Sequence, residues 1–250
     1  MRIQVISDIH LEERQTIPEV KPNAEVLFLA GDIGILGNKL FEEFIEYVDQ
    51  NWSTIFYVLG NHELYSKTKD IEQLIYEYDM FFKKFNNIVF LHHAKCQYAG
   101  YLIIGCTFWG RFENEQHISG SPHKIKIKKD GKLQEIGANV LTNLHTYSYE
   151  WVKSNIHPVL PTIILTHFPL TLENDKVRQV RHREEDRQTL KEYGAEMNLQ
   201  SDIGITCISG HTHFSHDFNK NGVRYISNQL GYEDEEKNGL CNSTDGIYIL

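Results

Sequence analysis

The first ten residues, Met1-Arg2-Ile3-Gln4-Val5-Ile6-Ser7-Asp8-Ile9-His10, place a carboxylate and an imidazole directly after an apolar run. A short run that is rich in β-branched residues and ends in polar ones is typical of a buried strand. We therefore expect a strand over residues 3–6, followed by a loop that carries Asp8 and His10.

The same arrangement occurs four more times along the chain. Apolar runs at residues 26–30, 55–59, 162–165 and 203–208 precede Gly31-Asp32, Gly60-Asn61-His62-Glu63, Thr166-His167 and Gly210-His211-Thr212-His213. In open α/β sheets, functional residues gather where the strands end at their carboxyl edge. Carboxylate, amide and imidazole groups are ligands that suit borderline divalent metals. The sequence thus predicts a metal centre at one edge of a sheet.

Helical patterns between these runs predict helices over the faces of a parallel sheet. Asn38 is expected to cap a helix whose apolar positions recur at the 3.6-residue period through Val48, and Asp70 a second helix that reaches Phe85. Further helices are expected at residues 138–155 and near 186–197, and further strands at 88–91, 101–106, 223–227 and 247–250. This alternation of strands and helices indicates an α/β fold.

The composition is that of an ordinary globular protein. The 250 residues have a mass of 29.2 kDa, 41% are hydrophobic and 24% are charged, and we expect a single domain over residues 1–250. The formal net charge of −9 argues against a surface dedicated to non-specific nucleic-acid binding. No run approaches the ~18 consecutive apolar residues of a membrane span.

Cysteine usage and the start of the chain indicate a compartment. The four cysteines show no C-x-x-C spacing, as expected of a reducing environment. Because the first expected strand begins at residue 2 or 3, we expect no cleaved leader. We therefore expect a cytoplasmic protein, or a nuclear one if its source has a nucleus, with neither a membrane partner nor an obligate protein partner.

A polar segment at about 111–137 is expected to be an insertion that faces the substrate. Within it, residues 124–128 alternate lysine with isoleucine, and Asp130-Gly131 is a good hairpin turn. One interpretation is an edge hairpin whose lysines prevent sheets from aggregating. The alternative is a cationic flap that meets a phosphate-bearing substrate.

The number of candidate ligands indicates more than one metal ion. Two divalent ions about 3.5–4 Å apart can clamp the attacking and leaving oxygens of a displacement at phosphorus. A tetrahedral zinc needs only four ligands. The motifs supply seven groups: Asp8, His10, Asp32, Asn61, His167, His211 and His213. We therefore expect two ions rather than one structural ion.

The motif order D-x-H, G-D, G-N-H-E, T-H, G-H-T-H resembles that of the calcineurin-like metallophosphoesterase superfamily. The resemblance extends from Asp8 to His213, and residues 227–232 are similar to the N-P-x-G-Y segment of many members, with Gln229 where proline is usual. It implies a four-layer α/β architecture, in which two mixed β-sheets pack as a sandwich flanked by helices.

The resemblance also implies a role for each motif residue. Asp8, His10 and His213 would bind the first ion, Asn61, His167 and His211 the second, and Asp32 would bridge the pair. His62 would act as general acid or electrostatic stabiliser while a metal-activated hydroxide attacks phosphorus. Glu63 stands where many members have aspartate; its carboxylate is one methylene longer but still able to orient His62, so we interpret the difference as variation within the superfamily. Mn²⁺ is the favoured metal, with Fe²⁺, Zn²⁺ or Co²⁺ as alternatives.

These roles predict a phosphodiesterase that hydrolyses a nucleotide or nucleic-acid diester, because a leaving alkoxide benefits from a nearby acid. One alternative is a phosphomonoesterase that acts on nucleotides or phosphorylated metabolites. A second is a phosphodiesterase of the RNA lariat debranching type, although Asp8 stands where that group has cysteine. A non-enzymatic scaffold is disfavoured because every motif residue is intact.

The remaining polar residues have competing interpretations. Arg181 and Arg183, with Lys176 and Arg178, would contact a substrate phosphate or begin a solvated helix. The acidic run at 233–236 is expected to be a solvated loop. Trp109 and Phe112 are expected to pack in the core rather than to stack on a base. Packing roles are also expected for histidines outside the motifs: His92, His93, His117, His123, His145, His157 and His216.

Overall fold

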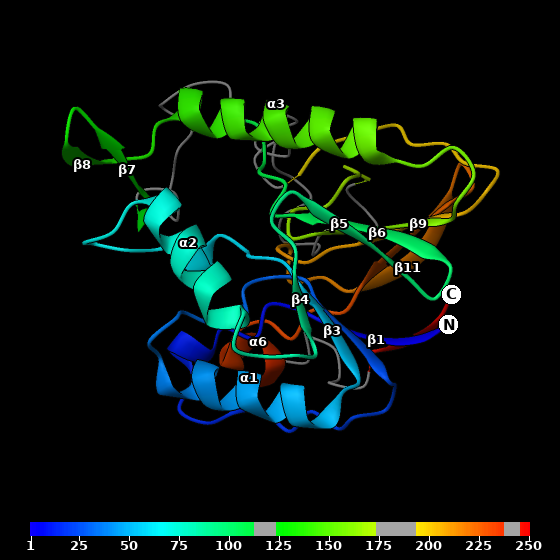
Figure 1. Ribbon diagram of the computed structural model, residues 1–250, viewed down its shortest axis with the longest axis horizontal. Coiled ribbons are helices and arrows are strands. Elements are labelled where there is room, and N and C mark those ends of the chain that lie inside the picture. Colours follow the sequence, from blue (N-terminus) through cyan, green and yellow to red (C-terminus); the bar gives the residue numbers. More distant parts are fainter. Residues whose placement is uncertain (113–123, 174–193, 238–245) are drawn as a thin grey trace.

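The computed structural model describes residues 1–112, 124–173, 194–237 and 246–250. Two mixed β-sheets lie face to face, with α1 and α2 beside one sheet and α3 over the other (Figure 1). The chain ends lie side by side, where the Met1 amino group donates to the Leu250 carbonyl at 2.7 Å. The α/β sandwich expected from the sequence is confirmed.

The first sheet has the strand order β13-β1-β2-β3-β4. Its strands are β1 (Arg2–Ile6), β2 (Val26–Leu29), β3 (Thr54–Tyr57), β4 (Ile88–Phe90) and β13 (Ile247–Ile249). Strands β1 to β4 are parallel, and β13 runs antiparallel to β1. The carboxyl ends of β1, β2 and β3 therefore lie at the same edge.

The second sheet has the order β11-β12-β10-β9-β6-β5. Its strands are β5 (Ala94–Tyr98), β6 (Tyr101–Cys106), β9 (Thr162–Thr166), β10 (Ile205–Ile208), β11 (His216–Lys220) and β12 (Val223–Ser227). The four inner strands are parallel, and β5 and β11 pair antiparallel at the two edges.

Apolar side chains fill the space on both faces of each sheet, which explains the continuous apolar runs of the inner strands. Between the sheets, Phe28 and Phe56 stack with ring centroids 4.9 Å apart in a cluster that includes Ile163 and Ile208 of the facing sheet. A second cluster joins the first sheet to α1 and α2, and a third joins the second sheet to Val152 of α3.

The helices begin where the sequence predicts. Asn38 Oδ1 accepts hydrogen bonds from two backbone N–H groups at the start of α1 (Lys39–Asn51). Asp70 Oδ1 accepts from Gln73 N–H at the start of α2 (Ile71–Phe82), which ends three residues before Phe85. The third helix, α3, spans Ala138–Asn155 as expected. Within the described residues, no helix is long and apolar enough to cross a membrane.

The predicted hairpin is present, but it does not lie at a sheet edge. Strands β7 (Lys126–Lys129) and β8 (Lys132–Glu135) form a separate two-stranded sheet, joined by Asp130 and Gly131 with φ of 51° and 76°. It is anchored because Ile125 is fully buried in the cluster beneath α2. The hairpin is therefore not the edge of either large sheet, although its isoleucines face the core and most of its lysines are exposed, as the edge-hairpin interpretation expects.

Three further expectations need correction. Residues 194–197 are not helical, because the N–H groups of Ala195 and Met197 donate to the carbonyls of Pro169 and Leu170, and residues 186–193 lie outside the described part. Edge strands β5 and β11 were not expected. The acidic run forms α6 (Glu233–Lys237) rather than a loop.

Candidate metal centre

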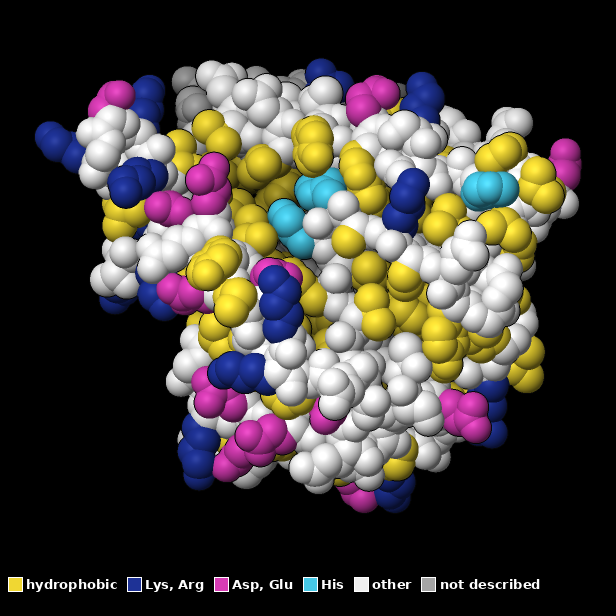
Figure 2. Space-filling view, in the orientation of Figure 1, with side chains coloured by type: hydrophobic (Ala, Val, Ile, Leu, Met, Phe, Trp, Pro, Cys, Tyr) yellow, Lys and Arg dark blue, Asp and Glu magenta, His cyan; other side chains and the backbone are white. Residues whose placement is uncertain are grey.

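The five motifs meet at the carboxyl ends of β1, β2, β3, β9 and β10. Their backbone is unusual, because five of the seven candidate ligands adopt a left-handed conformation: Asp8, His10, Asp32, His211 and His213, with φ between 51° and 74°. Such residues cost free energy and cluster at functional sites. Figure 2 shows one face of the molecule, where a hollow below α3 that is bordered by hydrophobic side chains contains histidines; the motif residues Asp8, His10 and His167 are themselves almost fully buried.

Glycines in the motifs allow the loops to approach this closely. A Cβ on Gly60 would lie 2.1 Å from Asp32 Oδ1, and one on Gly210 would lie 2.5 Å from Asp8 Oδ2. Both contacts are far shorter than van der Waals distance. Each glycine is therefore required so that a carboxylate can sit against the neighbouring loop.

The first group of candidate ligands comprises Asp8, His10 and His213. His10 Nε2 lies 3.0 Å from His213 Nε2, which in turn lies 3.6 Å from Asp8 Oδ1. Asp8 and His10 are buried, with 0% and 1% exposed surface. Two loops, one after β1 and one after β10, thus direct their polar atoms to one point.

The second group comprises Asp32, His167 and His211. His167 Nε2 is central: it lies 3.4 Å from Asp32 Oδ2, 3.2 Å from His211 Nδ1 and 3.0 Å from Asn61 Oδ1. Asp32 also belongs to a third group with His10 and His62, which connects the two others. The seven motif residues therefore form one continuous cluster.

This cluster fits divalent metal ions. Two ligand atoms bound at ~2.1 Å to one ion, at right angles, lie about 3 Å apart, which is the spacing of the paired imidazole nitrogens. One proton between two such nitrogens gives an N–H···N hydrogen bond, and when that proton is lost both lone pairs are available to a cation. Oxygen and imidazole donors without thiolate suit manganese, iron, zinc or cobalt.

The histidines are held by partners on their other nitrogen, as metal-binding histidines usually are. His167 Nδ1 lies 2.9 Å from the Ala30 carbonyl, and His213 Nδ1 contacts Glu235 Oε2. Burial opposes the charged ring of His167, yet Asp32 raises its pKa to about 9. Glu235 is buried, so the expectation of a solvated acidic run is wrong at this residue.

Two tyrosines orient the candidate ligands. Asn61 Nδ2 donates to the Tyr65 hydroxyl at 2.6 Å, which leaves Oδ1 to face His167. The Tyr232 ring stacks on the His10 ring, with centroids 4.3 Å apart. Neither tyrosine belongs to the five motifs, although Tyr232 ends the segment that resembles N-P-x-G-Y.

His62, at the start of the 3-10 turn η2 (His62–Leu64), is held by a residue that the sequence did not single out. Its Nδ1 lies 2.7 Å from Oε1 of Glu12, which is part of η1 (Leu11–Glu13). Its Nε2 lies 3.9 Å from Asp32 Oδ2 and 3.4 Å from the Tyr232 hydroxyl. Burial opposes the charged ring, but Asp32 and Glu12 raise the pKa of His62.

The structure gives Glu63 a role other than orienting His62. Its carboxylate accepts hydrogen bonds from the Asp32, Ile33 and Gly60 N–H groups at 2.9–3.0 Å and from the Tyr57 hydroxyl at 2.7 Å. These contacts tie the second motif to the third instead of orienting the His62 ring. Burial and the neighbouring Asp32 raise the pKa of Glu63 to about 7.

Gln229, which stands at the proline position of the N-P-x-G-Y resemblance, contacts the last motif through its side chain. Its Oε1 accepts from the His213 N–H at 2.5 Å. Its Nε2 donates to Thr212 Oγ1 at 3.0 Å and to the Phe214 carbonyl at 3.1 Å. A proline could make none of these side-chain bonds.

The other residues considered from the sequence are placed as follows. Arg181, Arg183, Lys176 and Arg178 lie outside the described residues, as do His117 and His123. Trp109 and Phe112 are buried in the core, as expected. His145 is buried, and its Nδ1 lies 2.7 Å from the Trp109 carbonyl.

Comparisons with known proteins assign the chain to a family. The sequence profile of a family described as calcineurin-like phosphoesterase matches residues 1–215. An uncharacterised protein of Acanthamoeba polyphaga mimivirus is 27% identical, with 95% of this chain and 94% of that protein covered. Among solved structures, one shows similarity at the level of the fold.

This structure is a phosphopantetheinyl hydrolase from Mycobacterium tuberculosis, with a TM-score of 0.63, 14% identity, and 98% of this chain and 94% of that chain covered. A second solved structure is a putative 5'-nucleotidase from Staphylococcus aureus, with a TM-score of 0.48, 15% identity, and 92% and 48% coverage. At 14% identity the likeness to the hydrolase concerns the architecture of the chain.

Proposed function

Because the chain belongs to the calcineurin-like phosphoesterase family, we propose that it is a dinuclear metal-dependent phosphodiesterase that acts on a nucleotide or nucleic-acid diester. The observation that carries the proposal is the continuous cluster in which Asp32 adjoins both groups of candidate ligands. Such an arrangement suits a carboxylate shared by two ions.

In this proposal the first ion is held by Asp8, His10 and His213, and the second by Asn61, His167 and His211. The 3.0 Å and 3.2 Å contacts between ring nitrogens within the two groups support the division. When bound, two divalent ions lower the pKa of water and stabilise the charge that develops on the phosphoryl oxygens. Mn²⁺ is the proposed metal, and Fe²⁺, Zn²⁺ and Co²⁺ suit the same donors.

His62 is proposed as the general acid. Glu12 beside Nδ1 favours a proton on that nitrogen and stabilises the charged ring, so that Nε2–H can donate. Nε2 faces Asp32 and is therefore directed towards the metal centre. An acid placed there protonates the leaving oxygen, which matters most for the alkoxide of a diester.

The proposal is tested with manganese-loaded protein and a matched pair of chromogenic substrates, bis(p-nitrophenyl) phosphate and p-nitrophenyl phosphate. We expect the higher kcat/KM for the diester. Replacing His62 with Ala should lower diester turnover by roughly 10²–10⁴-fold while the metal content stays unchanged. His157→Ala, a histidine outside the cluster, is the control.

Equal or better turnover of the monoester would instead favour the phosphomonoesterase alternative. Turnover of neither substrate, together with a biological effect that survives His62→Ala, would favour a scaffold. Including branched and linear RNA in the same panel separates the debranching alternative from a general nucleic-acid diesterase.

A further inference from the structure

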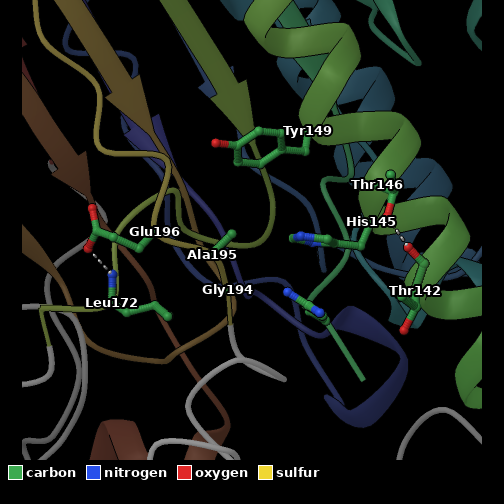
Figure 3. A pocket seen from close by; sticks show the side chains of 9 residues that line it. Thr142, His145, Thr146, Tyr149, Leu172, Gly194, Ala195 and Glu196 are labelled. Atoms are coloured by element: carbon green, nitrogen blue, oxygen red, sulfur yellow. Dashed lines mark hydrogen bonds between the residues drawn. The ribbon is translucent and has the colours of Figure 1, made fainter. Parts of the chain in front are cut away.

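A cavity of about 490 Å³ lies between α3 and the backbone that follows β9 (Figure 3). Sites for small organic ligands commonly measure ~300–1,000 Å³. His145 and Tyr149 project from α3 towards the opposite wall, where Leu172 and Ala195 lie. None of these residues belongs to the metal cluster, so the cavity is a separate feature of the chain.

His145 presents a hydrogen-bond acceptor to this cavity. Its Nδ1 lies 2.7 Å from the Trp109 carbonyl, which can only accept, so Nδ1 carries the proton. Burial lowers the pKa of His145, and the nearby Arg111 lowers it further, which keeps the ring neutral near pH 7. In a neutral ring protonated at Nδ1, Nε2 is an acceptor.

Donor groups and an aromatic face complete the lining. Arg111 follows β6 and borders the cavity, and no described residue pairs with its guanidinium. The Tyr149 ring is half-buried beside the His145 ring, with centroids 6.2 Å apart. The cavity therefore combines the His145 acceptor, a cationic donor, an aromatic surface, the apolar wall of Leu172 and Ala195, and the carboxylate of Glu196, which already accepts a hydrogen bond from the Leu172 N–H.

Two aromatic side chains, Phe168 and Trp109, pack between the metal centre and the residues that line the cavity. Phe168 packs its ring on that of His211, with centroids 3.9 Å apart, and on that of Trp109 at 5.7 Å. The Trp109 carbonyl in turn holds His145. A chain of side-chain contacts thus links the wall of the cavity to the candidate metal ligand His211.

We propose that this cavity receives the heteroaromatic base of a nucleotide substrate whose phosphoester lies at the metal centre. His145 Nε2 accepts an N–H of the base, Arg111 donates to a ring nitrogen or carbonyl oxygen, and the flat ring lies along Tyr149. Bases are recognised by such combinations of stacking and hydrogen bonds to their edges. This assignment rests on the proposed function, whose substrate class it specifies.

The first test is calorimetric titration of the metal-free full chain with adenosine, guanosine, cytidine and uridine, which need no catalysis. We expect at least one nucleoside to bind with one site per chain. Arg111→Ala should weaken that binding by about tenfold, and Arg2→Ala, at the start of β1, should leave it unchanged. Binding of none of the four, or equal binding by Arg111→Ala, would overturn the assignment.

The second test compares kcat/KM for a dinucleotide and for the same diester with abasic sugars. His145→Gln and Arg111→Ala should lower the ratio of the two values while turnover of the abasic diester stays within about twofold. An equal fall for both substrates would show a structural effect and overturn the assignment. If the wild type turns over neither diester, the proposed function fails, and nucleoside binding alone decides the role of the cavity.

Discussion

Glu12 and His62 form the contact that most affects the proposed chemistry at the scale of single residues. The 2.7 Å contact sets which ring nitrogen of His62 holds a proton at rest. Burial alone would raise the pKa of Glu12, but hydrogen bonds from His10 and His62 lower it to about 2. The carboxylate is therefore ionised when a general acid is needed.

Replacing Glu12 with Gln should lower diester kcat about tenfold, because the neutral amide stabilises the charged imidazole less well. The pKa of His62 should fall. A general acid must be protonated, and activity is lost as pH rises through its pKa, so the alkaline limb of the pH–rate profile should move to lower pH. Steady-state kinetics over pH measures both effects.

Glu13→Gln is the matched control, since Glu13 is the exposed neighbour of Glu12. It should leave both kcat and the alkaline limb unchanged. A Glu12→Gln profile that is lowered at every pH without any shift would contradict the positioning role.

At this scale, the sequence predicted residues that lie within motifs and missed those that act through tertiary contacts. Seven candidate ligands followed strand ends in a recognisable order. Glu12 and Glu235 have acidic neighbours in the sequence, and their charge alone does not distinguish them from those neighbours. Glu12 has one local signal, its position two residues after His10. Glu235 has none, because its contact with His213 depends on how α6 folds back over the loops.

α6 is the element that most clearly joins sequence-distant segments of the site. Its Glu235 accepts from the Tyr232 N–H at 3.1 Å and contacts His213 Nδ1. Glu235→Gln should weaken metal affinity by about 10–100-fold, as loss of such outer partners usually does. Competition with a metallochromic chelator measures the metal affinity, and Asp234→Asn, at an exposed neighbour, is the control. Unchanged affinity in Glu235→Gln, or equal weakening in the control, would contradict the role of Glu235 in holding His213.

The strand-to-loop turn at Gly60 provides a second test at this scale. The Cβ in Gly60→Ala would lie 2.1 Å from Asp32 Oδ1, so the second and third motifs must separate. We expect loss of bound metal and a stability decrease of about 1–3 kcal/mol. Elemental analysis and urea denaturation give the two values.

Gly37→Ala is the control for this substitution. Its Cβ would meet nothing within 4 Å, but its φ of +90° makes alanine unfavourable. It should therefore cost about 1 kcal/mol and retain the metal. Full metal retention by Gly60→Ala would show that the close approach is not required.

Prediction of elements from the sequence succeeded where the apolar pattern is continuous and failed where it is weak. The inner strands and three helices were predicted to within a few residues, since buried runs and caps are local signals. Strands β5 and β11 are half-buried edges with alternating exposure, so their sequences lack an apolar run. Residues 194–197 pair with 169–170 through backbone bonds that no local pattern encodes.

In the whole molecule, His93 is packed where α3 covers the second sheet. Its Nε2 lies 3.0 Å from Ser148 Oγ, and its ring contacts Tyr147 and Trp151 with centroids at 4.7 Å and 5.4 Å. Burial, helped by His92, lowers the pKa of His93 to about 4 from its ordinary 6.5. Between pH 6.5 and about 4, the His93 ring therefore binds a proton in the unfolded chain but not in the native protein.

Stability should consequently fall as pH decreases from about 6.5 to about 4. His93→Asn keeps a residue that tolerates the left-handed φ of 49° and removes the titrating ring, so its stability should fall less over that window. Urea denaturation at pH ~7 and ~4.5 measures the difference. Ser148→Ala removes the hydrogen-bond partner but keeps the ring, so it should lose as much unfolding free energy between the two pH values as the wild type does. An equally large loss in His93→Asn would contradict the prediction.

The central claim concerns the whole chain: loops from both sheets converge to bind a pair of divalent ions. It is tested most directly by elemental analysis of full-length protein that has been stripped with chelator, reloaded with Mn²⁺ and freed of excess metal. We predict two ions per chain, one ion in Asp8→Asn, and a larger loss in Asp32→Asn, because the Asp32 carboxylate belongs to the second group and also lies beside His10 of the first. One ion or none in the wild-type protein, or a greater loss in Asp8→Asn than in Asp32→Asn, would contradict the account.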